Sequence, residues 1–340
     1  MNKLPKEVVE SNSDLIRLAK EVTDKYGILP EDISIIQSGS IKTVWKIKTP
    51  DGIFCLKRLK QSLDKALFSV NAQIFIKNAG GKVPSIFAST GGPIAQYNGQ
   101  LFVLYEWLVG KDLDFGNPSD LKSAIQGLAE FHTASKGYSS NDEARVSSKL
   151  GKWPIQYSSM KNKLEAWKET AKTNKAQAVH GIYLNHTDRM LEICDKSLSL
   201  LEKSAYTTLT APDSPSIVLC HQDYGRGNAL LTRNGVYILD LDGVTFDLPA
   251  RDLRKLIGKQ AENKGHWDID TINSIVGWYT LVNPMTDDEK KVLYIDMMFP
   301  HWFYGLVKNL YLNSKPVKTS EIERISRLEQ SKISLLEKML

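Results

Sequence analysis

Cysteine is scarce in this chain of 340 residues. The three cysteines are Cys55, Cys194 and Cys220, and no two of them share a Cys-x-x-Cys spacing. Disulfide frameworks and zinc knuckles need paired or closely spaced cysteines, so the sequence argues against both. Thiols persist unpaired in a reducing compartment, which predicts that this chain folds inside a cell.

Long apolar runs and a strong charge of one sign are also missing. The first 13 residues are polar, which argues against a signal peptide. No apolar run approaches the length of a membrane span. The formal net charge is only +5, from 44 Lys and Arg against 39 Asp and Glu, and these charges are scattered. We therefore expect a soluble protein synthesised in the cytoplasm, with no membrane partner and no nucleic-acid partner.

The periodicity of apolar residues changes along the chain. Strands are expected at 33–36, 44–48, 53–59 and 101–107, with helices at 15–26 and 66–79. After Gly110 helices dominate, at 121–135, 160–171, 190–203 and most of 250–340, around a strand cluster at 216–220, 229–232 and 236–239. The pattern predicts an α+β protein with a small sheet-rich N-lobe, residues 1–107, and a larger, mainly helical C-lobe, residues 108–340.

Two segments of the second strand cluster carry a pattern suited to phosphoryl transfer. His221, Asp223 and Asn228 form His-x-Asp-x₄-Asn after an apolar strand, and Asp240 and Asp242 follow the next hairpin. One carboxylate can orient a hydroxyl nucleophile, while an amide and a second carboxylate supply the oxygen ligands that Mg²⁺ prefers. The alternative is a polar turn between two strands, in which His221 caps the backbone.

At these residues the chain resembles the aminoglycoside phosphotransferase and choline kinase family. Within that family it is most similar to the spore-coat CotS-type proteins of sporulating bacilli. The resemblance covers about residues 33–256 and implies a bilobal protein-kinase-like fold that binds ATP and Mg²⁺. It implies that Asp223 is the catalytic base and that His221 braces the loop. It also implies Asn228 and Asp240 as Mg²⁺ ligands, with Asp242 as a further candidate.

The same resemblance assigns nucleotide contacts in the N-lobe. Lys57 lies on the third expected strand, where this fold places the lysine that contacts the α- and β-phosphates. Gly39 and Ser40 occupy the phosphate-covering turn by position, although that turn has one glycine instead of G-x-G-x-x-G. Glu106 and Trp107 lie in the segment whose backbone holds adenine. Each assignment has an alternative: Lys57 could be a surface lysine, the turn with Gly39 and Ser40 an ordinary hairpin, and the segment with Glu106 and Trp107 simply the end of a strand.

One departure concerns the partner of Lys57. The N-lobe helix of the family carries a glutamate that pairs with the strand lysine, whereas no Glu occurs between residues 61 and 100 here. The amides of Asn71 and Gln73 are the candidates left on the expected helix. We therefore expect Lys57 to be held loosely, by Asn71, by Gln73 or by the nucleotide alone. That arrangement predicts weak nucleotide binding, nearer millimolar than micromolar, a gap of about 4 kcal/mol.

These observations favour transfer of the γ-phosphoryl group of ATP to a hydroxyl of a small molecule. The rival is a structural spore-coat protein that kept the fold with little or no catalysis, with other spore-coat proteins as partners. The missing helix glutamate favours that rival. A protein kinase is less suitable, because the interval from Asp240 to Asp252 has no room for a long activation segment. The resemblance places either protein in the spore coat after its cytoplasmic synthesis.

Overall fold

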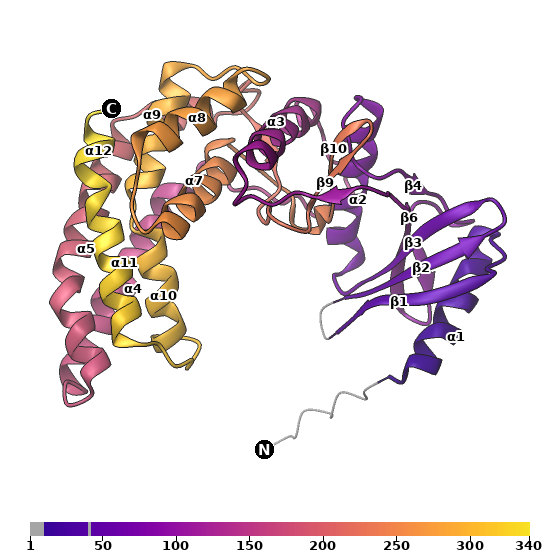
Figure 1. Cartoon of the computed structure of the whole chain (residues 1–340), viewed down its shortest axis with the longest axis horizontal. Coiled ribbons are helices and arrows are strands. Elements are labelled where there is room, and N and C mark those ends of the chain that lie inside the picture. The colour runs from indigo at the N-terminus through magenta and orange to yellow at the C-terminus, as the bar shows by residue number, and fades with distance from the viewer. Residues whose placement is uncertain (1–9, 40–41) are drawn as a thin grey trace. The chain divides into compact units, whose positions relative to one another are not determined.

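The computed structural model describes residues 10–39 and 42–340, which form two compact units (Figure 1). Unit 1 contains the described residues up to Leu113 together with Gly137–Ser147 and Gly227–Gly243. Unit 2 contains Asp114–Lys136, Ser148–Arg226 and Val244–Leu340. Each unit is thus assembled from separate stretches of sequence. The lobe boundary expected between residues 107 and 108 stays a prediction.

Unit 1 is built on an antiparallel sheet. Its strands run in the order β1-β2-β3-β6-β4, and β5 also pairs with β6. Their bounds are β1 (Asp32–Ser38), β2 (Thr43–Thr49), β3 (Gly52–Leu59), β4 (Ile86–Phe87), β5 (Ala95–Tyr97) and β6 (Gln100–Glu106). The expected strands of the N-lobe are therefore present, and β4 and β5 are short strands that the sequence pattern did not reveal.

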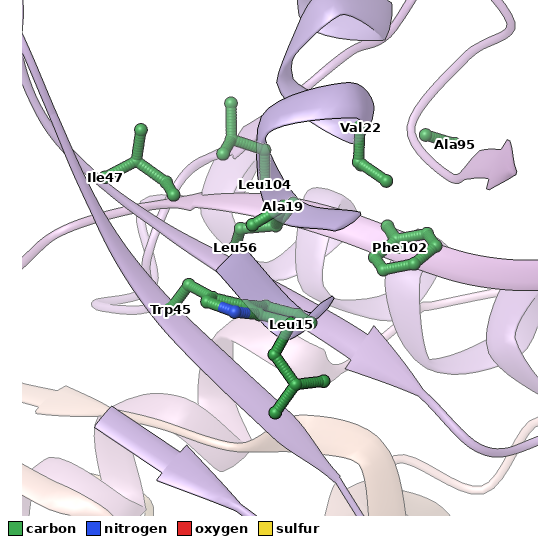
Figure 2. Close-up of a cluster of buried hydrophobic side chains, with 9 residues drawn as sticks. All are labelled: Leu15, Ala19, Val22, Trp45, Ile47, Leu56, Ala95, Phe102 and Leu104. Atoms are coloured by element: carbon green, nitrogen blue, oxygen red, sulfur yellow. The ribbon is translucent and has the colours of Figure 1, made fainter. Parts of the chain in front are cut away.

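Side chains alternate across this sheet because strand residues have a period of two. Leu56 of β3 points to a cluster with Trp45 of β2 and residues of α1 (Asn12–Thr23), as Figure 2 shows. Leu59 belongs instead to a second cluster, which includes Val70 of α2 (Leu63–Asn78). The two helices therefore cover opposite faces. Lys57 has the same parity as Leu59 and shares its face.

Unit 1 is completed by segments from later in the chain. The hairpin of β9 (Ala229–Thr232) and β10 (Gly235–Ile238) pairs with β7 (Lys111–Asp112). A Cβ on Gly110 would lie 2.5 Å from the backbone oxygen of Leu231, so this close approach requires glycine. The segment Gly137–Ser147 returns to α2, where the Tyr138 hydroxyl donates to the Phe68 carbonyl at 3.0 Å.

Unit 2 is mainly helical. Its helices are α3 (Pro118–Ser135), α4 (Trp153–Thr173), α5 (Ala178–Glu202), α6 (Tyr206–Leu209), α7 (Ala250–Lys264), α8 (Ile269–Thr280), α9 (Asp287–Met298), α10 (His301–Tyr311), α11 (Thr319–Ser331) and α12 (Ile333–Glu337). A two-stranded sheet joins β8 (Val218–Cys220) to β11 (Thr245–Asp247). The helical C-terminal part predicted from the sequence is confirmed.

The core of unit 2 contains paired charges as well as apolar side chains. Asp296 accepts hydrogen bonds from Arg254 Nε at 2.9 Å and from the Tyr157 hydroxyl, and it lies 2.8 Å from His301 Nε2. Buried charges persist when each has such partners. His180 is also buried, with Nδ1 2.9 Å from the Tyr311 hydroxyl.

Among residues 10–39 and 42–340, no helix combines the length and the apolar character that crossing a membrane requires.

The two faces of β3 allow a test of the unit 1 core. We expect Leu56→Ala to lower the free energy of unfolding by about 2–5 kcal/mol, because Leu56 is fully buried and its removal leaves a cavity. Ile53→Ala, at an exposed position of the same strand, should cost less than about 1 kcal/mol. Urea denaturation followed by tryptophan fluorescence measures both. Equal losses would contradict the described packing.

Candidate nucleotide and phosphate site

The β9–β10 hairpin brings two sequence-predicted residues together. Asn228 directly precedes β9 and Asp240 follows β10, and the strands pair Ala229 with Ile238. The Leu239 N–H also donates to the Asn228 carbonyl at 3.0 Å. Asp240 has a φ of 62°, in the left-handed region that few residues other than glycine adopt. Such strain persists only where the surroundings enforce it, and it is common at functional sites.

Lys57 is held by two carboxylates of the same unit. Its Nζ lies 2.5 Å from Asp240 Oδ1 and 2.7 Å from Asp242 Oδ2. The expectation that Lys57 is held loosely by Asn71, by Gln73 or by nucleotide alone is therefore wrong. Gln73 donates its amide to the Pro84 carbonyl at 2.7 Å. Charge compensation comes from the segment after β10 and not from α2.

The ion pairs outweigh burial for both partners. Burial acts to lower the pKa of Lys57, but Asp242 and Asp240 act more strongly together and raise it. Burial likewise acts to raise the pKa of Asp240, but Lys57 and Lys42 lower it to about 2. Both groups are therefore charged at neutral pH. The buried ammonium group of Lys57 therefore requires the two carboxylates to remain charged at its buried position.

Lys42 is a member of this cluster that the sequence analysis missed. Its Nζ lies 2.7 Å from Asp240 Oδ2, the oxygen that Lys57 leaves free. Lys42 stands next to β2, after the predicted phosphate-covering turn. The one feature of the sequence that pointed to Lys42 was its place after this turn. Its contact with Asp240 could not be predicted, because 198 residues separate the two.

A cavity of about 460 Å³ opens beside the cluster, entirely within unit 1. That volume is in the range of small-molecule and cofactor sites. The predicted residues that line it are Lys57, Glu106, Trp107, Asn228 and Asp240. The apolar side chains that line the cavity come from two distant stretches of the sequence. The first stretch supplies Ile36 and Val44, and the second supplies Leu230, Leu239 and Leu241. The cavity thus has apolar walls and a charged part, formed by Lys42, Lys57 and Asp240, which we call its charged end.

The strand-end residues contribute differently to this cavity. The Glu106 side chain accepts hydrogen bonds from the Ser85 N–H at 3.1 Å and from Ser85 Oγ at 2.9 Å. Its carboxylate is thus occupied, although the residue still lines the cavity. Lys46 Nζ lies 4.8 Å from the ring centre of Trp107, a cation–π contact.

Of the predicted phosphate-covering turn, Gly39 is exposed directly after β1, and Ser40 lies outside the described residues.

The predicted catalytic loop belongs to unit 2. His221 is buried and Asp223 is exposed, and the Asp223 N–H donates to His221 Nδ1 at 3.3 Å. Asp252 of α7 accepts the N–H of His221 at 2.6 Å and that of Gln222 at 3.0 Å. Gln222 has a φ of 73°, so this anchor also holds a strained backbone. The loop is therefore fastened to α7 through two backbone donors.

Asp252 has further buried partners that explain its ionisation. Burial acts to raise its pKa, but hydrogen bonding and charge from His132 lead the effects that lower it to about 2. His132 Nε2 lies 3.3 Å from Asp252, and its Nδ1 lies 2.7 Å from the Tyr279 hydroxyl. His132, Cys220 and Asp252 lie close enough together to be considered as metal ligands. However, the Cys220 thiol donates to the Leu248 carbonyl, so this group is a hydrogen-bonded core cluster.

The donor set of unit 1 fits a divalent cation better. Asp240 and Asp242 converge on the Lys57 ammonium, which shows that their oxygens already favour a positive charge between them. Asn228 adds an amide oxygen on the wall of the same cavity. Carboxylate and amide oxygens are hard ligands suited to Mg²⁺. The residues present are thus compatible with a bound Mg²⁺ ion.

Comparison with known proteins decides the family. Residues 32–271 match the family described as Phosphotransferase enzyme family. The chain belongs to this phosphotransferase family. The match includes β1, the cavity and the loop anchored by Asp252, so both units contribute to it. The resemblance seen at the sequence motifs is therefore confirmed.

Individual relatives extend the similarity over almost the whole chain. Spore coat protein S of Bacillus subtilis (strain 168) is 27% identical over 329 residues, which cover 95% of this chain and 94% of that protein. An aminoglycoside phosphotransferase from Alicyclobacillus acidocaldarius has a similar fold, with a TM-score of 0.76, 16% identity and 94% of each chain covered. An amicoumacin kinase in complex with AMP-PNP, Ca²⁺ and Ami gives a TM-score of 0.60 and 15% identity, with 97% of this chain and 94% of that chain covered. The predicted kinase-like fold class is confirmed.

The loop anchor predicts a particular dependence of stability on pH. The folded-state pKa of Asp252, about 2, lies below the ordinary value of 3.8. Its stabilising contribution is therefore fully present above pH 3.8 and is lost as the pH falls through about 2. The contribution should be about 2 kcal/mol at neutral pH. Asp252→Asn should lower the free energy of unfolding at neutral pH by at least this amount. The variant should also lose less stability than the wild type when the pH falls from about 4 to 2.

Urea denaturation at pH values from 7 to 2 measures this effect. Asp188→Asn is the matched control, because Asp188 is exposed on α5 and pairs with Lys168 at the surface. It should change stability by less than about 1 kcal/mol. If Asp252→Asn retains the acid dependence of the wild-type protein, Asp252 is not the ionised anchor.

Proposed function

We propose that this protein is an ATP-dependent phosphotransferase that acts on a hydroxyl group of a small molecule. The observation that supports it most is the cluster of Lys57, Asp240 and Asp242 at the charged end of the unit 1 cavity. A polyphosphate needs fixed cations, and a magnesium ion needs carboxylate oxygens, and this cluster supplies both. A purely structural surface has no need to bury such a group.

The apolar and the charged lining residues of the cavity suit the base and the phosphates of a nucleotide. The apolar side chains of Val44, Leu230 and Leu239 can enclose a planar base, whose edge would be held by the backbone at Glu106 and Trp107. The charged end, with Lys57, would take the phosphates. AMP-PNP bound to the related amicoumacin kinase supports a nucleotide in this protein also.

Asn228 and Asp240 are proposed to hold Mg²⁺, with Asp242 as a third oxygen donor. Mg²⁺ would supply neutralisation of the charge on the transferred phosphoryl group. To hold Mg²⁺, Asp240 would have to give up contacts with its lysine partners. Asp242 would then remain as a partner of Lys57, so Lys57 would stay charged at the wall of the cavity.

Asp223 is proposed to be the catalytic base. It is exposed, as a residue that receives a hydroxyl proton from an acceptor must be, and its backbone N–H is bound to His221 Nδ1. His221 is proposed to be a positioning residue, since it is buried and contacts the loop instead of solvent. The acceptor would be a small molecule, as in the related small-molecule kinases.

A structural role in the spore coat is the second candidate. Its support is the similarity to Spore coat protein S, which extends over 95% of this chain. The partners would then be other spore-coat proteins, and the location would be the spore coat. The two candidates are compatible if a coat protein kept its enzymatic site.

Binding of Mg²⁺ and ATP separates the two candidates. We expect 5 mM Mg-ATP to raise the melting temperature by about 3 °C or more, because a ligand that binds the folded state stabilises it. Asp240→Asn should abolish most of this shift, since it removes a carboxylate from the cluster. Asp32→Asn, at an exposed position on β1, is the control and should keep the shift. No shift in the wild-type protein would favour the purely structural role.

Asp223→Asn tests the proposed base. We expect release of ADP to fall by about 10²–10⁴-fold, the range that general base catalysis supplies, while the affinity for Mg-ATP stays within about twofold. ADP release is measured first with water as acceptor and then with a panel of small alcohols. Calorimetry measures the affinity. Turnover at the wild-type rate in this variant would show that Asp223 is not the base.

A further inference from the structure

The second lysine of the cluster is not explained by the roles proposed above. Lys42 directly precedes β2, and its Nζ lies 2.7 Å from Asp240 Oδ2. It also lines the cavity. Each oxygen of Asp240 is thus held by a different ammonium group, Oδ1 by Lys57 and Oδ2 by Lys42.

The two lysines differ in how readily they can leave Asp240. The Lys57 side chain is 8% exposed and has a second carboxylate partner, Asp242. The Lys42 side chain is 28% exposed. Removing a buried ammonium from its partner leaves an unsolvated charge, whereas a partly exposed ammonium can be hydrated. When Asp240 binds another cation, Lys57 therefore stays paired with Asp242, and Lys42 is the lysine that is released into the cavity.

The released ammonium would remain at the charged end of the cavity. The side chain of lysine is a flexible stem with a compact charge, which suits binding to phosphate as a point charge. The turn before Lys42 has a single glycine, Gly39, where a phosphate-covering loop of this kind ordinarily has three. A sequence with fewer glycines lets the backbone approach a phosphate closely at fewer positions, and a side-chain cation can substitute for such contacts.

We propose that Lys42 is a phosphate-binding residue that exchanges between Asp240 and the terminal phosphates of the nucleotide. In the free protein it neutralises Asp240. In the complex it neutralises the phosphates, while Asp240 turns to the metal. This inference rests on the proposed function, because it assumes a polyphosphate ligand in the unit 1 cavity.

Calorimetry with three probes tests the proposal. The probes are Mg-ATP, magnesium tripolyphosphate and adenosine, and the proteins are the wild type, Lys42→Met, Lys42→Arg and Lys48→Met. Lys48 is the matched control, since it lies on β2, the strand that Lys42 directly precedes, is exposed and pairs with Asp32 at 3.8 Å. All variants are first compared with the wild type by melting temperature.

We expect Lys42→Met to weaken Mg-ATP and tripolyphosphate about tenfold and to leave adenosine unchanged, because only the phosphates meet the lost charge. Lys42→Arg should retain most of the affinity, and Lys48→Met should change none of the three. Equal or tighter binding of Mg-ATP by Lys42→Met would overturn the proposal, since Lys42 would then be no more than a blocking partner of Asp240. An equal loss for adenosine would also overturn it.

The same measurements separate this proposal from the proposed function. If the wild type binds Mg-ATP and Lys42→Met binds it equally well, the proposal about Lys42 fails and the function stands. If the wild type binds tripolyphosphate but neither ATP nor adenosine, the nucleotide function fails and the effect of Lys42→Met on tripolyphosphate decides the role of Lys42. If the wild type binds neither phosphate probe, both are wrong.

Discussion

The buried ammonium of Lys57 is the constraint on which unit 1 depends. It lies on the α2 face of the sheet, one residue from Leu56 in the core on the opposite face. A charge at that depth is tolerated only with carboxylates in contact, and Asp240 and Asp242 provide them. The β9–β10 hairpin must therefore belong to the same unit as β3. The cavity, its charged end and the position of Lys42 follow from that requirement.

Much of this arrangement could be predicted from the sequence because it is local. The alternation of apolar residues identified β2, β3 and β6, and the spacing from His221 to Asn228 singled out the loop. The partners of Lys57 could not be predicted in the same way. Family resemblance predicts a carboxylate on α2, whereas Asp240 is 183 residues away from Lys57 in the sequence. No periodicity encodes a contact of that range.

Two of the five described non-glycine residues with positive φ lie at the proposed site. Gln222 and Asp240 both have positive φ, and each stands in one of the two segments that carry the proposed chemistry. Each is held by strong partners, the carboxylate of Asp252 for Gln222 and two ammonium groups for Asp240. Residues of this conformation cost about 1–3 kcal/mol each. The anchors in both units thus fix side chains whose backbone would otherwise relax.

The separated stretches of unit 1 have a consequence for how the protein is made. A ribosome releases β3 and Lys57 long before Gly227–Gly243, so the nascent N-terminal part holds a lysine at a buried position with neither carboxylate. If that part of the sheet packed before the hairpin was made, the Lys57 ammonium would be buried without a carboxylate partner, which is energetically costly. The nascent sheet is therefore expected to stay open until the hairpin has been translated. The same reasoning makes residues 1–107 a poor choice for separate expression.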